Sequence, residues 1–325
     1  MKNLFNLLVL ILLISSCASQ KHGAQKYKQG IVTPVGYSYP KKETFKILSW
    51  NVEHFLDPHD DPYINNAREN NPDSTMGNKV PYMLEALREA DADIVVLQEF
   101  EGAKFLRRLA QDSLPEMGYQ FFADAPSHTW YMNVVVMSRF PLGILYSYGN
   151  VTTPLPNWIN EEGQKESQNQ INTRAWSLDV YPSEDYSFVL TALHLKAGRG
   201  ERNESMRLGQ INFLKGQFER FLAEDPSRNL LVVGDLNSTP NSREIQTLKK
   251  GSNDNSSFID PMDTTVLTHT AIELTRRLDY TLPNVNMMKE LVPGSTKPVY
   301  FFDPEKQDET ADHLPVVIEF YRKDK

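Results

Sequence analysis

Acidic, amide and imidazole side chains recur in this sequence where short apolar segments end. Such segments are followed by Asn51 and Glu53, by Gln98 and Glu99, and by Asp235 and Asn237. His194 ends another segment, Asp279 lies within RRLDYTL, and Asp312 and His313 precede LPVVIEF. Several carboxylates that met at one place would repel one another without a cation. Mg²⁺ prefers oxygen ligands and neutralises phosphoryl charge during in-line attack, while a histidine beside a carboxylate serves as a base. These residue types therefore indicate metal-assisted chemistry on a phosphoester.

Each of these residues also has a simpler explanation, because Asp and Asn at strand ends cap turns and begin helices. The sequence motifs of other catalytic chemistries, however, are absent. It contains no GxSxG nucleophile elbow, no phosphate-binding GxxxxGK[ST] loop and no GxGxxG loop. Its single cysteine, Cys17, excludes a zinc site built from several thiolates. Metal-assisted phosphoester hydrolysis is the chemistry that remains for the set as a whole.

Short strands are the elements that must position these side chains. FKILSW (45–50) alternates apolar and polar residues, and the continuous apolar run in ADIVVLQEF (92–100) predicts a strand covered on both faces. MNVVVMSRFPL (132–142) is similar, and LPVVIEFY (314–321) alternates again. The stretch 175–195 predicts a β-hairpin that turns at PSED.

Helical periodicity is confined to a few segments. It predicts helices over 79–90 and, most clearly, over 204–224, where apolar residues recur at three- and four-residue spacing, with a shorter helix over 242–250 after Pro240. Residues 57–77 and 152–172 are predicted to be long loops. No repeat and no linker between two domains is visible, so we expect one mixed α/β domain.

The N-terminus is typical of a processed targeting segment. Lys2 precedes an apolar run from Leu4 to Ile14, and small residues stand directly before Cys17, which resembles a bacterial lipoprotein signal. We expect residues 1–16 to be the signal peptide, Cys17 to be lipidated, 17–42 to be a tether and 43–325 to be the catalytic domain. The alternative is a buried cysteine in an ordinary signal anchor. Lipidation would place the protein in the bacterial cell envelope, and the absence of an acidic cluster after Cys17 favours the periplasmic side.

The charge balance bears on the substrate. The formal net charge is −8, and loss of Lys2 with the signal peptide makes it −9. Proteins that bind nucleic acid without sequence preference usually carry a basic surplus. The sequence shows no such surplus overall, although a local basic wall is compatible with it.

Six segments together resemble the endonuclease/exonuclease/phosphatase superfamily. They occur in the family's order and are SWNVEHF, DIVVLQEF, LHLK, GDLNSTP, RRLDYTL and ADHLPVV. The superfamily includes deoxyribonuclease I, abasic-site endonucleases, sphingomyelinases and inositol polyphosphate phosphatases. The resemblance runs from about Phe45 to Phe320 and implies a four-layer α/β sandwich of the deoxyribonuclease I type, with two mixed β-sheets packed face to face and helices outside. It places the active site where strand ends of both sheets converge.

The resemblance also implies roles for the polar residues. Glu99 would be the principal ligand of Mg²⁺, with Mn²⁺ as an alternative, and Asn51 and Asp312 would help to hold the metal or its water. Asp235 and Asn237 would orient and activate the attacking water. His313 would contact the phosphate or act as general base, His194 would donate to the phosphate or assist the leaving group, and Asp279 would orient a catalytic histidine.

Three further positions are less constrained by the pattern. Arg174 resembles a phosphate-facing arginine, with a surface salt bridge as the alternative. Arg207, in the segment KAGRGERNESMR, is by the family pattern the nearest basic group to the site and would contact the phosphate, with a solvated helix start as the alternative. Glu53 matches a second polar position that varies in the family, and a solvated strand end explains it equally well.

The first functional hypothesis is a metal-dependent phosphodiesterase of nuclease type, because GDLNSTP followed by RRLDYTL resembles the nuclease-like bacterial branch. The alternatives are an envelope enzyme acting on phospholipids, sphingomyelin or inositol phosphates, and a non-catalytic binding lipoprotein on the same fold. The implied partners are a phosphoester substrate, which nucleic acid could supply, and the membrane through the lipid anchor. No protein partner is implied.

Overall fold

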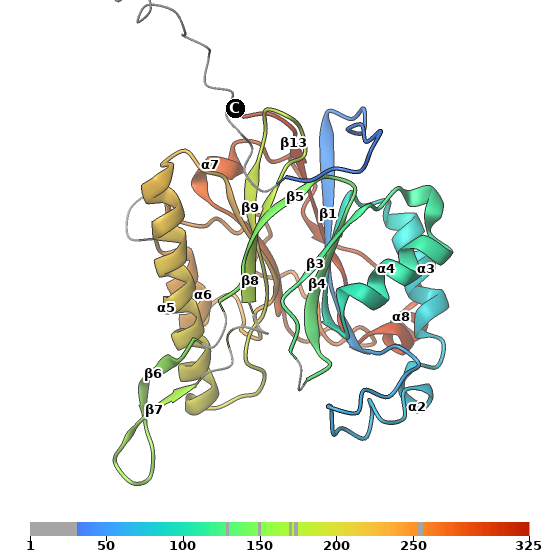
Figure 1. Cartoon of the computed structure of the whole chain (residues 1–325). Helices are drawn as coiled ribbons and strands as arrows, with labels where there is room; N and C mark the ends of the chain where they lie inside the picture. The colour runs from blue at the N-terminus through green and yellow to red at the C-terminus, as the bar shows by residue number, and fades with distance from the viewer. Residues whose placement is uncertain are drawn as a thin grey trace, which may run out of the picture. The chain divides into compact units, whose positions relative to one another are not determined.

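The strands form two mixed sheets and one separate hairpin (Figure 1). The first sheet has the order β12 (Lys297–Pro298), β13 (Val316–Tyr321), β1 (Thr44–Phe55), β2 (Ile94–Phe100), β4 (Asn133–Ser138) and β3 (Phe121–Asp124). The second has the order β11 (Asp279–Pro283), β10 (Leu230–Asp235), β9 (Phe188–His194), β8 (Ala175–Val180) and β5 (Leu142–Tyr146). The pairs β1–β2 and β9–β10 are parallel, and the other pairs are antiparallel.

This computed structural model describes residues 31–127, 130–148, 151–168, 171, 175–251 and 256–324. The predicted signal peptide, Cys17 and the first part of the tether lie outside these ranges, as does Arg174. No helix among the described residues is long and apolar enough to cross a membrane.

Helices cover the outer faces of the two sheets. Beside the first sheet lie α3 (Lys79–Ala90), α4 (Ala103–Ser113) and α8 (Pro304–Thr310), and beside the second lie α5 (Glu201–Glu224) and α6 (Arg243–Lys249) (Figure 1). The short helix α7 (Val285–Met288) follows β11 and places Met287 in the layer between the sheets. One buried cluster joins α3 and α4 to the first sheet, a second joins the two sheets, and a third joins α5 and α6 to the second sheet. The four layers confirm the predicted sandwich.

Side-chain alternation explains how both sheets become covered on two faces. In β2, Ile94 and Val96 pack between the sheets, while Val95 and Leu97 pack against the helices. In β10, Leu231 and Val233 face the layer between the sheets. Because successive residues of a strand point to opposite faces, a continuous apolar run fits only a strand buried on both sides. The prediction made from the Ile94–Leu97 run is confirmed.

The helical predictions are confirmed, with small shifts at their ends. The helix predicted over 79–90 is α3, and the one predicted over 204–224 is α5, which begins three residues earlier at Glu201. The apolar residues of α5 that set its period are buried against β8–β10. The short third helix is α6, whose N-terminal cap Ser242 accepts a hydrogen bond from the Ile245 amide.

One loop prediction was wrong. Within 152–172, β6 (Thr153–Ile159) and β7 (Lys165–Gln168) form a hairpin outside both main sheets. It packs on α5 at Gly209, where an added Cβ would lie 2.2 Å from the Pro154 carbonyl oxygen. The two prolines of β6 obscure its strand pattern, but both are exposed while Thr153 and Leu155 are buried. The other predicted loop, 57–77, contains only the short helix α2 (Asp73–Met76).

A buried acid anchors the end of β10 opposite Asp235. The Asn229 side chain donates to both carboxylate oxygens of Glu290 at 3.0 Å, and the Tyr186 hydroxyl donates to the same carboxylate. Burial raises the pKa of Glu290 to about 7, which the two donors only partly oppose. This strand, which delivers Asp235 to the site, is therefore tied down by a carboxyl group with an unusually high pKa.

The raised pKa predicts how stability changes with pH. Between the ordinary pKa near 4.5 and the raised value near 7, the native protein binds more protons than the unfolded chain, so the free energy of unfolding falls as pH rises. Replacing Glu290 by glutamine should remove up to about 3 kcal/mol of this decline. Urea denaturation at about pH 5 and about pH 8 measures it, with Glu89→Gln on the exposed face of α3 as control. An unchanged pH slope in Glu290→Gln would refute the assignment.

Candidate active site

The candidate site continues the layer between the two sheets. Phe45 and Ile47 of β1 face this layer, and the same alternation carries Asn51 toward it. In β9 and β10 the alternation likewise directs His194 and Asp235 inward, and the register aligns Asp235 with both His194 and Asp279. Polar residues thus replace apolar ones at one end of the core, and all four are at most 3% exposed.

Glu99 reaches this cluster because the backbone departs from regular strand geometry. Regular alternation after Val95 and Leu97 would direct Glu99 toward the helices, but its φ is 59° and the pairing of β2 is irregular there on both sides. A bulge of this kind re-aims a side chain. Among the described residues, four of the five non-glycine residues with positive φ are Glu53, His54, Glu99 and Asn237. Such conformations are costly and concentrate at functional sites.

Gly234 lets β10 deliver Asp235 at close range. Its φ is 138°, and an added Cβ would lie 1.9 Å from the Leu193 carbonyl oxygen of β9. Only glycine tolerates both the conformation and the contact. The close approach of β10 to β9 at this position therefore depends on glycine.

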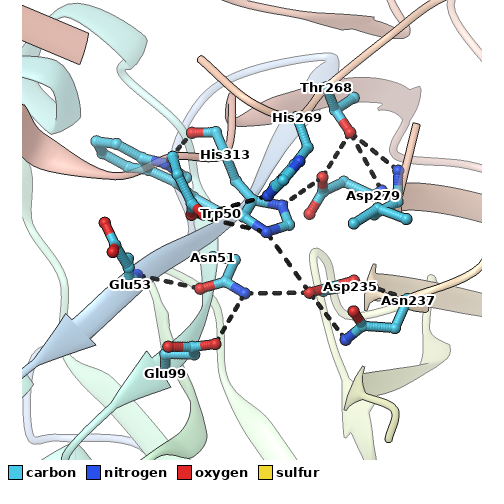
Figure 2. A network of polar contacts seen from close by, with 12 residues as sticks. Trp50, Asn51, Glu53, Glu99, Asp235, Asn237, Thr268, His269, Asp279 and His313 are labelled. Atoms are coloured by element: carbon cyan, nitrogen blue, oxygen red, sulfur yellow. Dashed lines mark hydrogen bonds and ion pairs between the residues drawn. The ribbon is translucent and has the colours of Figure 1, made fainter. Parts of the chain in front are cut away.

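His313 and Asp279 form a buried pair. His313 Nδ1 lies 2.8 Å from Asp279 Oδ2, and the Thr268 hydroxyl donates to the same oxygen at 2.6 Å (Figure 2). The Trp50 indole donates to the His313 carbonyl at 2.9 Å. The ring is thereby fixed with Nε2 directed away from Asp279, 3.8 Å from both Asp235 Oδ2 and Asp312 Oδ1. Asp279 therefore lies where the orienting role predicted for it requires.

Asp235 lies at the centre of the cluster. Its Oδ2 accepts from the Asn51 amide at 3.1 Å and from the Asn237 amide at 3.2 Å (Figure 2). The same oxygen is 3.6 Å from His194 Nε2. The Asn237 backbone N–H donates to the other carboxylate oxygen at 2.7 Å. Asn51 also donates to Glu99 at 3.4 Å. The amide of Asn51 thus links carboxylates that belong to different sheets.

The electrostatics of the cluster depend on burial and on neighbouring charge. Burial alone lowers the pKa of His313, but the carboxylates of Asp279 and Asp235 outweigh it and raise the pKa well above its ordinary value. Burial raises the pKa of Asp235, and the positive charge of His313 only partly opposes this. Burial also raises the pKa of Glu99, against a hydrogen bond from Asn51. The cluster has more buried negative groups than its imidazole can balance.

This excess fits a divalent cation. Glu99, Asp235, Asp279 and Asp312 bring four carboxyl groups together, and Asp279 Oδ1 is buried without a hydrogen-bond partner among the described residues. Two groups with ligand atoms close enough for one ion are Asp235–Asp279–His313 and His269–Asp312–His313. Oxygen-rich sites of this kind suit a hard ion such as Mg²⁺. The predicted ligands Glu99, Asn51 and Asp312 all lie in or beside the cluster, and Asp312 is the most exposed of them.

Sequence reasoning missed three residues of the site. Thr268 and His269 come from the loop before β11, where only two apolar residues, Val266 and Leu267, precede them and predict no strand. His54 was part of the SWNVEHF motif, but only the structure shows its backbone N–H donating to Glu99 at 3.1 Å. The His54 ring lies between the Tyr131 hydroxyl and the Arg68 guanidinium. Arg68 thus connects the long 57–77 loop to the site.

Glu53 lies at the edge of the site. Its backbone N–H donates to Asn51 Oδ1, and its carboxylate is 3.4 Å from the Lys79 ammonium group. The carboxylate contacts the N-terminus of α3 through Lys79 and remains 37% exposed, which agrees with the solvated strand end given as the alternative.

The structure does not bring Arg207 into the cluster. Its guanidinium pairs with Glu244 at 2.9 Å and donates to the carbonyls of Lys196 and Gly198. Both charged side chains are about 5% exposed. The phosphate contact predicted for Arg207 is therefore replaced by a buried ion pair that fastens α5 to α6 and to the turn after β9. The prediction for Arg174 lies outside the described residues.

This correction predicts a stability effect. Replacing Arg207 by methionine leaves the Glu244 carboxylate buried and unpaired, which should lower the free energy of unfolding by about 3–5 kcal/mol. The double variant Arg207→Met/Glu244→Met should recover much of the loss. Chemical denaturation measures both. If Arg207→Met instead raised the KM for substrate with unchanged stability, the phosphate-binding role would be restored.

The layers, two mixed β-sheets packed face to face with helices outside, match those of the deoxyribonuclease I-like sandwiches. The chain belongs to the Endonuclease/Exonuclease/phosphatase family, which it matches over residues 48–295. Members of this family are generally hydrolases of phosphoesters and generally use a divalent metal ion. No curated protein matches the chain.

Solved structures share this fold at low identity. An endonuclease/exonuclease/phosphatase from Bacteroides vulgatus is 14% identical, with a TM-score of 0.57, over 87% of this chain and 100% of the other. The human Nocturnin catalytic domain with bound sulfate is 17% identical, with a TM-score of 0.54, over 87% and 96%. D. rerio TDP2 complexed with a single-strand DNA product is 14% identical, with a TM-score of 0.53, over 86% and 99%. Identities this low establish the fold alone.

Proposed function

We propose that the protein is a divalent-metal-dependent phosphodiesterase of nuclease type. The observation that carries the proposal is the meeting of Asn51 and Glu99 from one sheet with His194 and Asp235 from the other, beside the Asp279–His313 pair. A site that combines an oxygen-rich cation position, an oriented imidazole and a buried carboxylate suits in-line attack of water on a phosphate. Mg²⁺ is the proposed ion, with Mn²⁺ as a substitute.

The acidic and amide residues would bind the metal ion and activate the water. Glu99, Asn51 and Asp312 would hold the metal ion, which when bound supplies positive charge to a phosphate oxygen. Asp235 has a raised pKa and accepts hydrogen bonds from two amides, which suits a base that orients and deprotonates water.

The two histidines would act on the phosphate itself. Asp279 raises the pKa of His313 and keeps its imidazole charged, with Nε2 facing the cluster. A charged imidazole suits stabilisation of negative charge on the phosphate better than general-base catalysis. His194 presents Nε2 between Glu99 and Asp235 and would donate to the phosphate or to the leaving group.

A second candidate substrate class is supported by a cavity next to the site. Its volume is 560 Å³, and it is lined by Asp57, Asp60, Asp61, Glu101 and Asp124, by Lys104 and Arg108, and by Tyr63, Phe105 and Trp130 among others. Trp130 packs on Tyr131, whose hydroxyl contacts His54 in the site. Acidic groups repel a polyanion, and acidic groups together with aromatic faces attract a cationic group. This observation favours a phospholipid or sphingomyelin with an amine headgroup as the alternative substrate.

A substrate panel tests the proposal and separates the candidates. Plasmid DNA, RNA, sphingomyelin and inositol phosphates are incubated with the protein and Mg²⁺ or Mn²⁺, and turnover is compared. The proposal predicts fastest cleavage of nucleic acid. Faster release of phosphocholine from sphingomyelin would replace it by the second candidate. Absence of turnover on every phosphoester, with folded protein, would favour the non-catalytic binding lipoprotein.

We also propose that the protein is held in the bacterial cell envelope by a lipid on Cys17, facing the periplasm. The support is the apolar run and the small residues before this cysteine. Metabolic labelling with a palmitate analogue should mark the protein but not its Cys17→Ala variant. Equal labelling of both would exclude this anchor.

A further inference from the structure

The loop before β11 places a third imidazole, His269, against the catalytic cluster. The His269 ring packs edge-on against the His313 ring with centroids 4.6 Å apart. His269 Nε2 lies 3.2 Å from Asp312 Oδ2, and the Nε–H of Arg276 donates to His269 Nδ1 at 3.2 Å. Three side chains thus form a line, Arg276 to His269 to Asp312, that ends on a predicted metal ligand. Figure 2 shows His269 beside His313 and Asp279.

The backbone holds this line in place. His269 pairs with Arg276 and with His313 through isolated β-bridges. The Leu314 N–H donates to the Thr268 carbonyl and the Ala271 N–H to the Asp312 carbonyl, both at 2.8 Å. The loop is therefore fastened to the segment carrying Asp312 and His313 on both sides of His269. The His269 side chain is only 9% exposed, so its ring has little freedom to turn.

The donor chemistry of Arg276 fixes the tautomer of His269. A guanidinium group has donors only, so the Nδ1 atom that it contacts must accept and carries no proton. The single proton of the neutral imidazole is then on Nε2, where it is donated to Asp312 Oδ2. A protonated Nε2 has no lone pair for a metal ion. Although His269, Asp312 and His313 are close enough to share an ion, the contact with Arg276 therefore makes His269 a hydrogen-bond donor.

We propose that Arg276 and His269 are positioning residues for Asp312. His269 holds Oδ2 so that Oδ1 remains directed at His313 Nε2, 3.8 Å away, and at the metal position. Arg276 acts only through His269, by fixing the proton on Nε2. Residues that orient a metal ligand in this way typically change metal affinity or activity about 10–100-fold when removed. This inference rests on the proposed metal-dependent function.

A double-variant cycle tests the line. The protein, His269→Ala, Arg276→Ala and the double variant are compared for Mn²⁺ affinity by electron paramagnetic resonance and for kcat and KM on bis-p-nitrophenyl phosphate. We expect His269→Ala to weaken Mn²⁺ binding and lower kcat about 10–100-fold with little change in KM. Arg276→Ala should give a smaller loss, and the double variant should match His269→Ala, because removal of His269 leaves Arg276 nothing to act through. His269→Gln, whose amide nitrogen can donate from the position of Nε2, should recover much of the loss.

Several results would overturn the inference. Additive losses in the double variant would show that Arg276 acts independently of His269. Complete loss of Mn²⁺ binding in His269→Ala and His269→Gln would make His269 a ligand. Losses no larger than those of Arg107→Ala, on the exposed face of α4, would remove the role altogether. If the native protein bound Mn²⁺ without hydrolysing any phosphoester, the proposed function would be wrong. The Mn²⁺ affinities of the variants would still test whether Arg276 and His269 position Asp312.

The tautomer can be read without any variant. In protein labelled with ¹⁵N-histidine, a long-range ¹H–¹⁵N correlation spectrum distinguishes a proton on Nε2 from a proton on Nδ1. The structure requires the Nε2–H form for His269. A proton on Nδ1 would contradict the contact with Arg276 and overturn the inference, even if the variants failed to fold.

Discussion

Replacing His313 by alanine is expected to lower turnover of bis-p-nitrophenyl phosphate by about 10²–10⁴-fold, the range typical of a lost acid–base or charge-stabilising group. The expectation follows from the position of the imidazole, which Asp279 orients and keeps charged while Nε2 faces Asp235 and Asp312. In the proposed role the ring would stabilise charge that develops on the phosphate in the transition state, so kcat should fall far more than KM rises. Steady-state kinetics with saturating Mg²⁺ or Mn²⁺ measures the effect.

Asp279→Asn is the matched companion to this variant. It keeps the size of the side chain and removes the charge that raises the pKa of His313. It should lower kcat in the same direction, and adding it to His313→Ala should cost little more, because Asp279 acts through the imidazole. Undiminished turnover in His313→Ala, with unchanged thermal stability, would refute the assignment of the site.

Replacing Glu99 by glutamine should weaken Mn²⁺ binding by more than about 100-fold, beyond the 10–100-fold effect of residues that only support a ligand. The carboxylate accepts from Asn51 and from the His54 backbone, yet its pKa is raised by burial, so it lacks a full countercharge. An ion would supply that charge, and the neutral amide would bind it weakly. Isothermal titration with Mn²⁺ measures the change directly.

Glu89→Gln on the exposed face of α3 is the control for Glu99→Gln, since it makes the same chemical change on the helix that precedes β2, whereas Glu99 lies at the other end of that strand. Removing an uncompensated buried charge should also leave Glu99→Gln at least as stable as the native protein. Native Mn²⁺ affinity in Glu99→Gln would move the metal position to the Asp235–Asp279–His313 group.

Much of the site follows from strand periodicity. The alternation in FKILSW and the apolar runs before Glu99 and Asp235 fixed which segments are strands covered on two faces, and Asn51, His194 and Asp235 continue the inward-facing positions. A sequence pattern of period two is enough to place such residues, because strand geometry leaves only two directions for a side chain.

The rest depends on contacts that no local pattern encodes. Regular alternation would have turned Glu99 away from the site, and only the bulge with its positive φ brings it in. His269 comes from an irregular loop whose position is set by backbone hydrogen bonds to Leu314 and Asp312. Arg207 of α5 pairs with Glu244 of α6, which is 37 residues away in sequence. These three cases required the tertiary structure.

The polar residues at the strand ends are held in place by the tightly packed sheets that carry them. Two sheets that are apolar on both faces carry the side chains, so little reorganisation is needed when substrate binds. The strained backbone at Glu53, His54, Glu99 and Asn237 is maintained by this packing. This pre-organisation accounts for the close hydrogen-bond network seen around Asp235 (Figure 2).

We propose that this cluster hydrolyses phosphodiesters with the help of a divalent ion. The most direct measurement is hydrolysis of bis-p-nitrophenyl phosphate by EDTA-treated protein as Mg²⁺ or Mn²⁺ is titrated back. We expect no turnover in EDTA and a saturable return of turnover with either ion. His313→Ala should show no such return. Full turnover in the presence of EDTA, or none at any metal concentration in folded protein, would contradict it.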